Sequence, residues 1–173
     1  MPTIGLLLGG SPGPDAFRIA AFMRGLNSSG FVENQNVAVE YRWAENRYER
    51  LPALAADLVA RRVAVMVSLG GNAASMAAKA STATIPIVFQ VGSDPVQMGL
   101  IGSLARPGGN LTGVTFLGAE LTPKMLEVLH ETIPKTAIVG TIENPTNPNV
   151  DAVRRNVQAA ANKLGRTLFV AKA

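Results

Sequence analysis

Residues 63–72 read VAVMVSLGGN, an almost wholly apolar run of strand length that ends in two glycines and an asparagine. Such a strand is typical of the centre of a parallel sheet, where both faces are buried. Largely apolar runs also occupy residues 3–8, 85–91 and 111–117, each next to a cluster of Gly, Pro, Ser or Asn. Repetition of this pattern predicts strands joined by helical crossovers, as in a parallel α/β sheet.

The segments between these runs have a helical period. Asp15 is predicted to cap a helix that stops near Gly30, and residues 48–62 and 73–80 read as two further helices. Residues 35–43 alternate and predict a second strand, nearer an edge of the sheet. Asp94 and Pro95 read as the cap and first position of another helix. The first helix is expected to turn four apolar residues inward: Phe17, Ala20, Ala21 and Met23.

After residue 117 the cycle restarts. We expect a helix over residues 121–131, a strand over 137–142, a helix over 150–164 and a strand over 167–171. The sequence therefore predicts a doubly wound α/β ligand-binding lobe at residues 1–117, followed by the beginning of a second, truncated α/β lobe at residues 118–173.

Composition excludes several classes of protein. The chain is 47% hydrophobic and 16% charged, which favours a buried globular core, and no apolar run approaches the length of a membrane span. The net charge is +4, but the Lys and Arg residues are scattered and form no basic block interleaved with aromatic residues. We therefore expect no nucleic-acid partner. The absence of cysteine excludes disulfides, thiolate metal sites and a cysteine nucleophile. The start at Met1 lacks a signal-peptide pattern, so we expect a cytosolic chain or a mature form without its leader.

A ligand is expected at the carboxyl edge of the sheet, where strand order reverses. Four clusters fall there: residues 9–11, 68–73, 90–94 and 115–117. The loops at Gly70-Gly71 and Gly92-Ser93 lead into predicted helix N-termini, which favour a carboxylate or phosphate. The alternative is that these glycines only turn the chain.

Motifs for catalysis and nucleotide binding are incomplete. Gly10 and Gly13 match the last two glycines of a dinucleotide fingerprint, but Leu8 stands in place of the first, and no P-loop occurs. His130 is the single histidine and reads as a solvated residue near a helix C-terminus. The sequence therefore predicts no catalytic residues, no metal site and no cofactor, and we expect the protein not to be an enzyme.

Two candidate ligand contacts have competing interpretations. Asp94 is suited to pair with a cationic group, but it is equally suited to cap a helix, and the two roles can coexist. Phe116, at the end of the fifth strand, is suited to touch a ligand or to pack in the core.

The order of several segments resembles one family, the ABC-transporter substrate-binding proteins related to tryptophan- and tyrosine-binding importer components. The likeness extends over essentially the whole chain. The matching segments are residues 36–45 (NVAVEYRWAE), 50–59 (RLPALAADLV), 85–89 (IPIVF), 92–96 (GSDPV), 106–114 (RPGGNLTGV) and Asn144-Pro145.

This resemblance implies a type I periplasmic-binding-protein fold, with two α/β lobes that close on a small molecule. It also implies an extracytoplasmic or periplasmic location and a membrane ABC permease as partner. The chain departs from its relatives at Asn72, where they often carry Thr or Ser. The resemblance implies ligand contact at six positions of this sequence: Ser11, Asn72, Ala73, Ser93, Asp94 and Phe116.

We expect the ligand to be amino-acid-like or another small carboxylate. Asn72, the Ala73 amide and Ser93 would donate hydrogen bonds to its carboxylate, while Asp94 would pair with its ammonium group. Hinge rotation near Gly118 would bring Asn144 and Asn147 over the ligand.

Two other functions stay open, a ligand-sensing domain of a regulator and, less favoured, an α/β enzyme. For assembly, we expect a possible homodimer through residues 118–173, with the strands at residues 137–142 pairing antiparallel.

Overall fold

The computed structural model describes residues 1–116, 118–134, 138–145 and 150–172 of the 173-residue chain. The chain divides into two compact units, Met1–Thr115 and Phe116–Ala173, here called unit 1 and unit 2. Within the described ranges, no helix has the length and apolar character that crossing a membrane requires.

Unit 1 contains a sheet of five strands that are parallel throughout, in the order β2-β1-β3-β4-β5. The predicted α/β class is confirmed. The apolar run that ends at Leu69 forms the central strand, and the alternating run at residues 35–43 contains an edge strand. The strands are β1 (Thr3–Leu8), β2 (Ala38–Trp43), β3 (Val65–Leu69), β4 (Ile87–Val91) and β5 (Leu111–Thr115).

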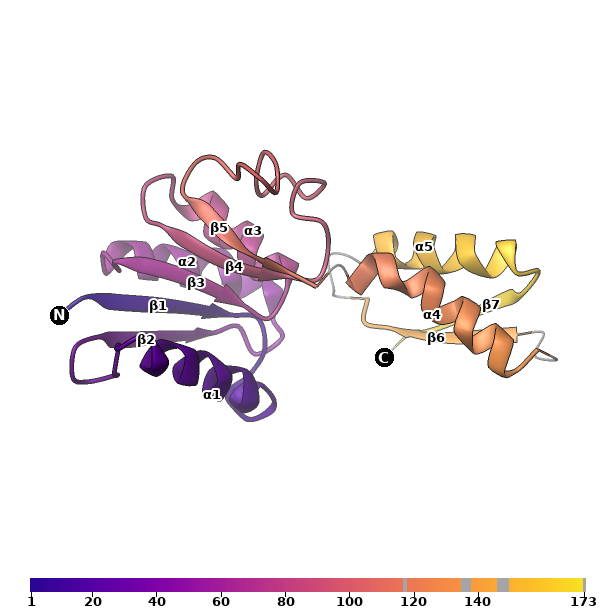
Figure 1. The fold of residues 1–173 in the computed structure, drawn as a ribbon, viewed down its shortest axis with the longest axis horizontal. Coiled ribbons are helices and arrows are strands. Elements are labelled where there is room, and N and C mark those ends of the chain that lie inside the picture. Colours follow the sequence, from indigo (N-terminus) through magenta and orange to yellow (C-terminus); the bar gives the residue numbers. More distant parts are fainter. Residues whose placement is uncertain (117, 135–137, 146–149, 173) are drawn as a thin grey trace. The chain divides into compact units, whose positions relative to one another are not determined.

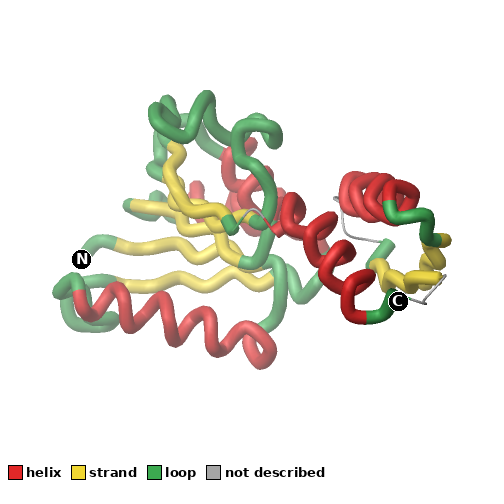
Figure 2. The backbone as a smooth tube through the Cα atoms, turned by 45° about the vertical axis from the view of Figure 1, so that its right-hand side comes forward, coloured by secondary structure: helices red, strands yellow, loops and turns green. Residues whose placement is uncertain are grey.

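Helices cover both faces of this sheet (Figure 1). Figure 2 shows α1 (Pro12–Ser28) running along one face, where it packs against the side chains of Ile4, Leu6 and Leu8. The opposite face, which includes Leu7, packs against α2 and α3. Successive β1 side chains thus enter different halves of the core, which explains why the strand is apolar throughout. The other helical segments are η1 (Tyr48–Arg50), α2 (Leu51–Ala60) and α3 (Asn72–Ser81).

The prediction for α1 was wrong in its start and in its buried face. The helix begins at Pro12, with Ser11 in the capping position, so that Asp15 lies inside the first turn. Phe17 is 67% exposed, and the residues that pack inward are Ile19, Phe22 and Leu26. Pro12 is the signal that indicates the true start, because proline is favoured at the first helical position.

No helix follows Pro95, contrary to prediction. Residues 95–99 form turns, with the Met98 N–H donating to the Asp94 carbonyl oxygen at 3.0 Å. Gly99 then adopts a φ of +67°, in the left-handed region that ends helical structure. The segment between β4 and β5 is therefore a loop.

An ionic network joins the edge strand β2 to α2. The Arg42 Nε donates to Asp57 Oδ2 at 2.6 Å, and Arg61 Nε donates to the same oxygen at 3.0 Å. These hydrogen bonds lower the pKa of the Asp57 carboxyl.

The described residues of unit 2 form two parallel strands and two helices. Strands β6 and β7 pair with each other, and a small core of Leu126, Ala160 and Ala161 lies between the helices and the strands. Position 137, the expected start of the first strand, lies outside the described residues. The elements are α4 (Gly118–Thr132), β6 (Ile138–Glu143), α5 (Val150–Lys163) and β7 (Thr167–Lys172).

One ion pair ties α5 to β6, and one face of the strands stays uncovered within unit 2. The Glu143 carboxylate is buried and accepts hydrogen bonds from Arg154, which raise the pKa of that guanidinium. Three apolar side chains of the two strands, by contrast, are exposed: Ile138, Ile142 and Phe169.

Candidate functional site

The candidate site lies at the carboxyl edge of the unit 1 sheet, beside the point between β1 and β3 where strand order reverses. The loops that follow these two strands touch each other. The Gly9 N–H donates to the Leu69 carbonyl oxygen at 3.3 Å, and a Cβ atom at Gly9 would lie 3.0 Å from the carbonyl oxygen of Gly70. These two glycines are therefore needed for close packing of backbone against backbone, whatever else the loops do.

Buried hydroxyl groups fix α3 beneath the site. Ser68 of β3 and Ser75 of α3 are both fully buried, and their Oγ atoms lie 2.9 Å apart in a hydrogen bond. Because α3 begins directly at Asn72, this contact holds the first turn of the helix at the end of β3.

The Asn72 side chain joins the β3 loop to the β4 loop. Its Nδ2 donates to Ser93 Oγ at 2.8 Å, while its Oδ1 accepts a hydrogen bond from the Gly92 N–H at 3.2 Å. On the other side, Thr115 Oγ1 of β5 donates to the Ser93 carbonyl oxygen at 3.0 Å. Side chains thus link the ends of three neighbouring strands around Ser93.

Asp94 was predicted to cap a helix, but it caps the turn that follows β4 instead. Its Oδ1 accepts hydrogen bonds from the Val96 N–H at 2.8 Å and the Gln97 N–H at 3.3 Å. Its second oxygen, Oδ2, has no hydrogen-bond partner among the residues that the structure describes. Asp94 is partly exposed, so solvent or a ligand can reach its side chain.

Ser11 and Ala73 lie at the same edge of the sheet, and no hydrogen bond among the described residues joins either of them to Ser93. Ser11 makes no side-chain bond to the first turn of α1, and its hydroxyl is partly exposed. Ala73 lies in the first turn of α3, where backbone N–H groups lack intrahelical acceptors. Phe116 follows β5 directly and is 63% exposed, so the described residues do not bury it in a core.

Sequence reasoning missed a buried carboxylate beside the first loop. Asp15 is 6% exposed, pairs with Arg18, and has an oxygen 1.9 Å from where a Cβ atom at Gly10 would stand. Gly10 is thus needed to accommodate Asp15.

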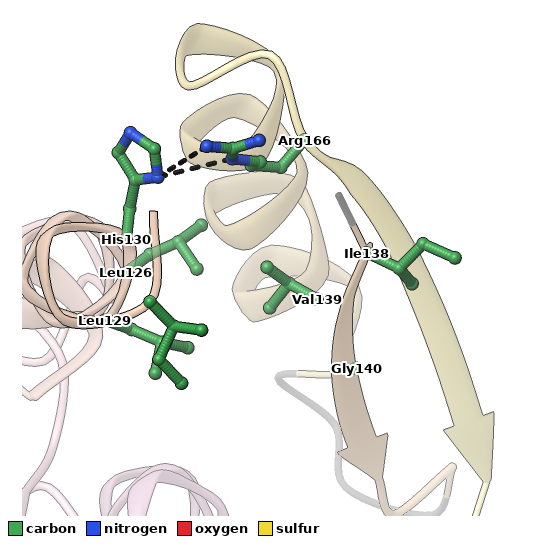
Figure 3. Close-up of a pocket in the computed structure, with 8 residues that line it drawn as sticks. Leu126, Leu129, His130, Ile138, Val139, Gly140 and Arg166 are labelled. Carbon is green, nitrogen blue, oxygen red and sulfur yellow. Dashed lines mark hydrogen bonds between the residues drawn. The ribbon is translucent and has the colours of Figure 1, made fainter. Parts of the chain in front are cut away.

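Unit 2 holds a separate small pocket of about 130 Å³, shown in Figure 3. His130 was predicted to be solvated, but its Nδ1 accepts a hydrogen bond from Arg166 Nη2 at 2.8 Å, joining α4 to the segment before β7. An arginine can only donate, so this nitrogen carries no proton. Arg166 also donates to the Pro134 carbonyl oxygen. Apart from His130 and Arg166, the pocket is lined by apolar residues. Across the described residues, no three His, Asp or Glu side chains gather as a metal site would require.

Comparisons with known proteins agree on one family. A model of the ABC transporter substrate binding proteins matches residues 13–173. A curated tyrosine-binding protein of Clostridioides difficile is 29% identical over 129 residues, which make up 74% of this chain and 36% of that protein.

Solved structures extend the likeness to the fold. A conserved domain protein from Vibrio cholerae superposes with a TM-score of 0.83 at 28% identity, over 99% of this chain and 56% of that one. An ABC domain in complex with L-Trp from Streptococcus pneumoniae gives a TM-score of 0.82 at 20% identity, over 99% and 57%. The chain therefore spans little more than half of these structures and about a third of the curated relative.

The expected type I periplasmic-binding-protein-like fold is confirmed by these superpositions. Because the family model extends over nearly all of the sequence, the chain belongs to the ABC transporter substrate binding protein family.

Proposed function

We propose that this chain belongs to the solute-binding component of an ABC importer and binds a small amino-acid-like or carboxylate ligand. The observation that carries the proposal is the Asn72–Ser93–Asp94 cluster at the carboxyl edge of the sheet. It combines hydrogen-bonding side chains with the Asp94 carboxylate, whose Oδ2 has no hydrogen-bond partner among the described residues. An amino acid needs this combination, because its carboxylate accepts hydrogen bonds and its ammonium group pairs with an anionic side chain.

The names of relatives support this ligand class. One relative is a tyrosine-binding protein, and a solved structure with this fold is in complex with L-Trp. In the proposed complex, Asn72, the Ala73 N–H and Ser93 face the ligand carboxylate and Asp94 its ammonium group. Ser11 and Phe116 complete the contact set.

The proposal extends to the architecture of the binding protein. Residues 1–117 form the first ligand-binding lobe, and residues 118–173 begin the second lobe. The ligand lies in the cleft between lobes, and closure by a hinge near Gly118 brings Asn144 over it. Asn147, the other expected contact, lies outside the described residues.

The proposed setting is extracytoplasmic, with a membrane permease receiving the closed, liganded form. A homodimer through residues 118–173 stays a prediction, and light scattering of the chain tests it. A ligand-sensing domain of a regulator is the alternative, since it would use the same kind of site. An enzyme is less favoured because the described residues of the site include no nucleophile paired with a base.

A thermal-shift screen of the chain over amino acids, small carboxylates and purines tests the proposal. A ligand at 100 times its Kd adds about 2.7 kcal/mol to the free energy of unfolding, so a true ligand raises the unfolding temperature clearly. We expect aromatic amino acids to do so. A shift given by purines alone would contradict the proposed ligand class.

A further inference from the structure

We infer that Asn72 sets the direction of the Ser93 hydroxyl, so that Ser93 acts as a donor toward the ligand and selects one that presents an acceptor oxygen, such as a carboxylate. This inference rests on the proposed function and deepens it. Asn72 then acts as a positioning residue for Ser93.

The orientation of the Asn72 amide follows from its backbone neighbour. The Gly92 N–H is a donor and needs an acceptor, so the Asn72 atom 3.2 Å away must be the oxygen. The other end of the amide is therefore the NH₂ group, which can only donate. It lies 2.8 Å from Ser93 Oγ, which must accept.

The consequence concerns the hydrogen of the Ser93 hydroxyl. Because Oγ accepts from Asn72, its own hydrogen points elsewhere, and the described residues offer it no acceptor. A hydroxyl that accepts one hydrogen bond becomes a stronger donor. Ser93 is partly exposed, so this hydrogen is available to a ligand.

Both partners of this bond are held in place. Asn72 is the first residue of α3, which the Ser68–Ser75 pair fixes on β3, and Thr115 holds the Ser93 carbonyl from the β5 side. Turning Ser93 Oγ toward another partner would break its hydrogen bond with Asn72.

Asn72→Asp is the decisive change, since aspartate has the shape of asparagine but only accepts. One of its oxygens can still take the Gly92 N–H. The other must accept from the Ser93 hydroxyl, which turns the lone pairs of Ser93 outward and removes Ser93 as a donor for a carboxylate. The preference for an acceptor-bearing ligand should therefore be lost.

The test uses L-tyrosine, tyramine (which lacks the carboxylate) and 3-(4-hydroxyphenyl)propionate (which lacks the ammonium group) in calorimetric titrations. We expect N72D to weaken binding of the propionate by at least about tenfold and to leave tyramine unchanged or improved. An equal loss for all three compounds would indicate a merely structural role and overturn the inference.

A double-mutant cycle separates hydroxyl direction from simple charge repulsion. In an S93A background the hydroxyl is gone, so N72D should cost clearly less propionate affinity than it does in the wild type. The same loss in both backgrounds would mean that the new charge alone acts, which contradicts the inference.

One readout needs no ligand. In the wild type, one Asn72 Nδ2 proton is hydrogen-bonded to Ser93 Oγ. In S93A this bond is lost, so the NMR chemical shift of that proton should move toward the value of a free side-chain amide. If it does not move, the hydrogen bond on which the inference stands is absent. If the wild type binds none of the three compounds, the proposed function fails for amino-acid-like ligands, and the inference fails with it. If the wild type binds them and N72D keeps the same preference among the three compounds, only the inference is rejected.

Discussion

Asp94→Ala is expected to weaken the binding of an amino-acid ligand by about 2–5 kcal/mol, the usual cost of removing one partner of a desolvated, hydrogen-bonded charge pair. Asp94 is suited to this role because one carboxylate oxygen is held by the turn at Val96 and Gln97 while the other has no partner among the described residues. The ligand ammonium would lose its only proposed anionic partner. Calorimetric titration measures the effect.

Asp94→Asn is the matched control, because it retains an oxygen for the Val96 and Gln97 N–H groups and removes the charge. The capping role predicts that D94A loses about 1 kcal/mol of stability while D94N loses little. The ligand role predicts that both variants bind an amino acid poorly. Normal affinity in D94N would leave Asp94 with the cap alone.

Gly113→Ala is expected to destabilise unit 1 by about 1–3 kcal/mol, because the added methyl group would overlap with Phe89 and force the strands to shift. Gly113 of β5 stands in register with Phe89 of β4, and the aromatic ring lies against it. A Cβ atom at position 113 would be 2.1 Å from the Phe89 carbonyl oxygen and 2.6 Å from the ring. The β4–β5 pair would have to separate, and chemical denaturation measures the loss.

Gly140→Ala serves as the control, since Gly140 is also a strand glycine but has no neighbouring atom within 4 Å of an added Cβ. Alanine is favoured over glycine inside a strand, so this variant should be as stable as the wild type or slightly more stable. Equal behaviour of the two variants would refute the close contact between Phe89 and β5.

The centre of the sheet could be predicted from the sequence because β1 and β3 are buried on both faces. An apolar run bounded by glycine and proline leaves little room for another interpretation, and β1 has its predicted bounds, Thr3–Leu8. The β2 edge position also followed from its alternating pattern. Where periodicity was weak, prediction failed: Phe17 was assigned to the buried face of α1 although it is exposed.

The site could be predicted only in outline. The rule that ligands gather at the carboxyl ends of parallel strands selects the loops that contain Asn72 and Ser93. It does not show that these two side chains bond to each other, because they are 21 residues apart and their contact depends on β3 and β4 being neighbours. The same limit applies to Asp15, whose burial depends on how the β1 loop folds back on α1.

The most direct test of the central claim is an NMR titration of the 173-residue chain with L-tyrosine, following backbone amide signals. The proposal predicts saturable shifts concentrated at Asn72, Ala73, Ser93 and Asp94. The amides of β6 and β7 should move little. Absence of saturable shifts, or shifts confined to residues 118–172, would contradict binding at the carboxyl edge of the unit 1 sheet.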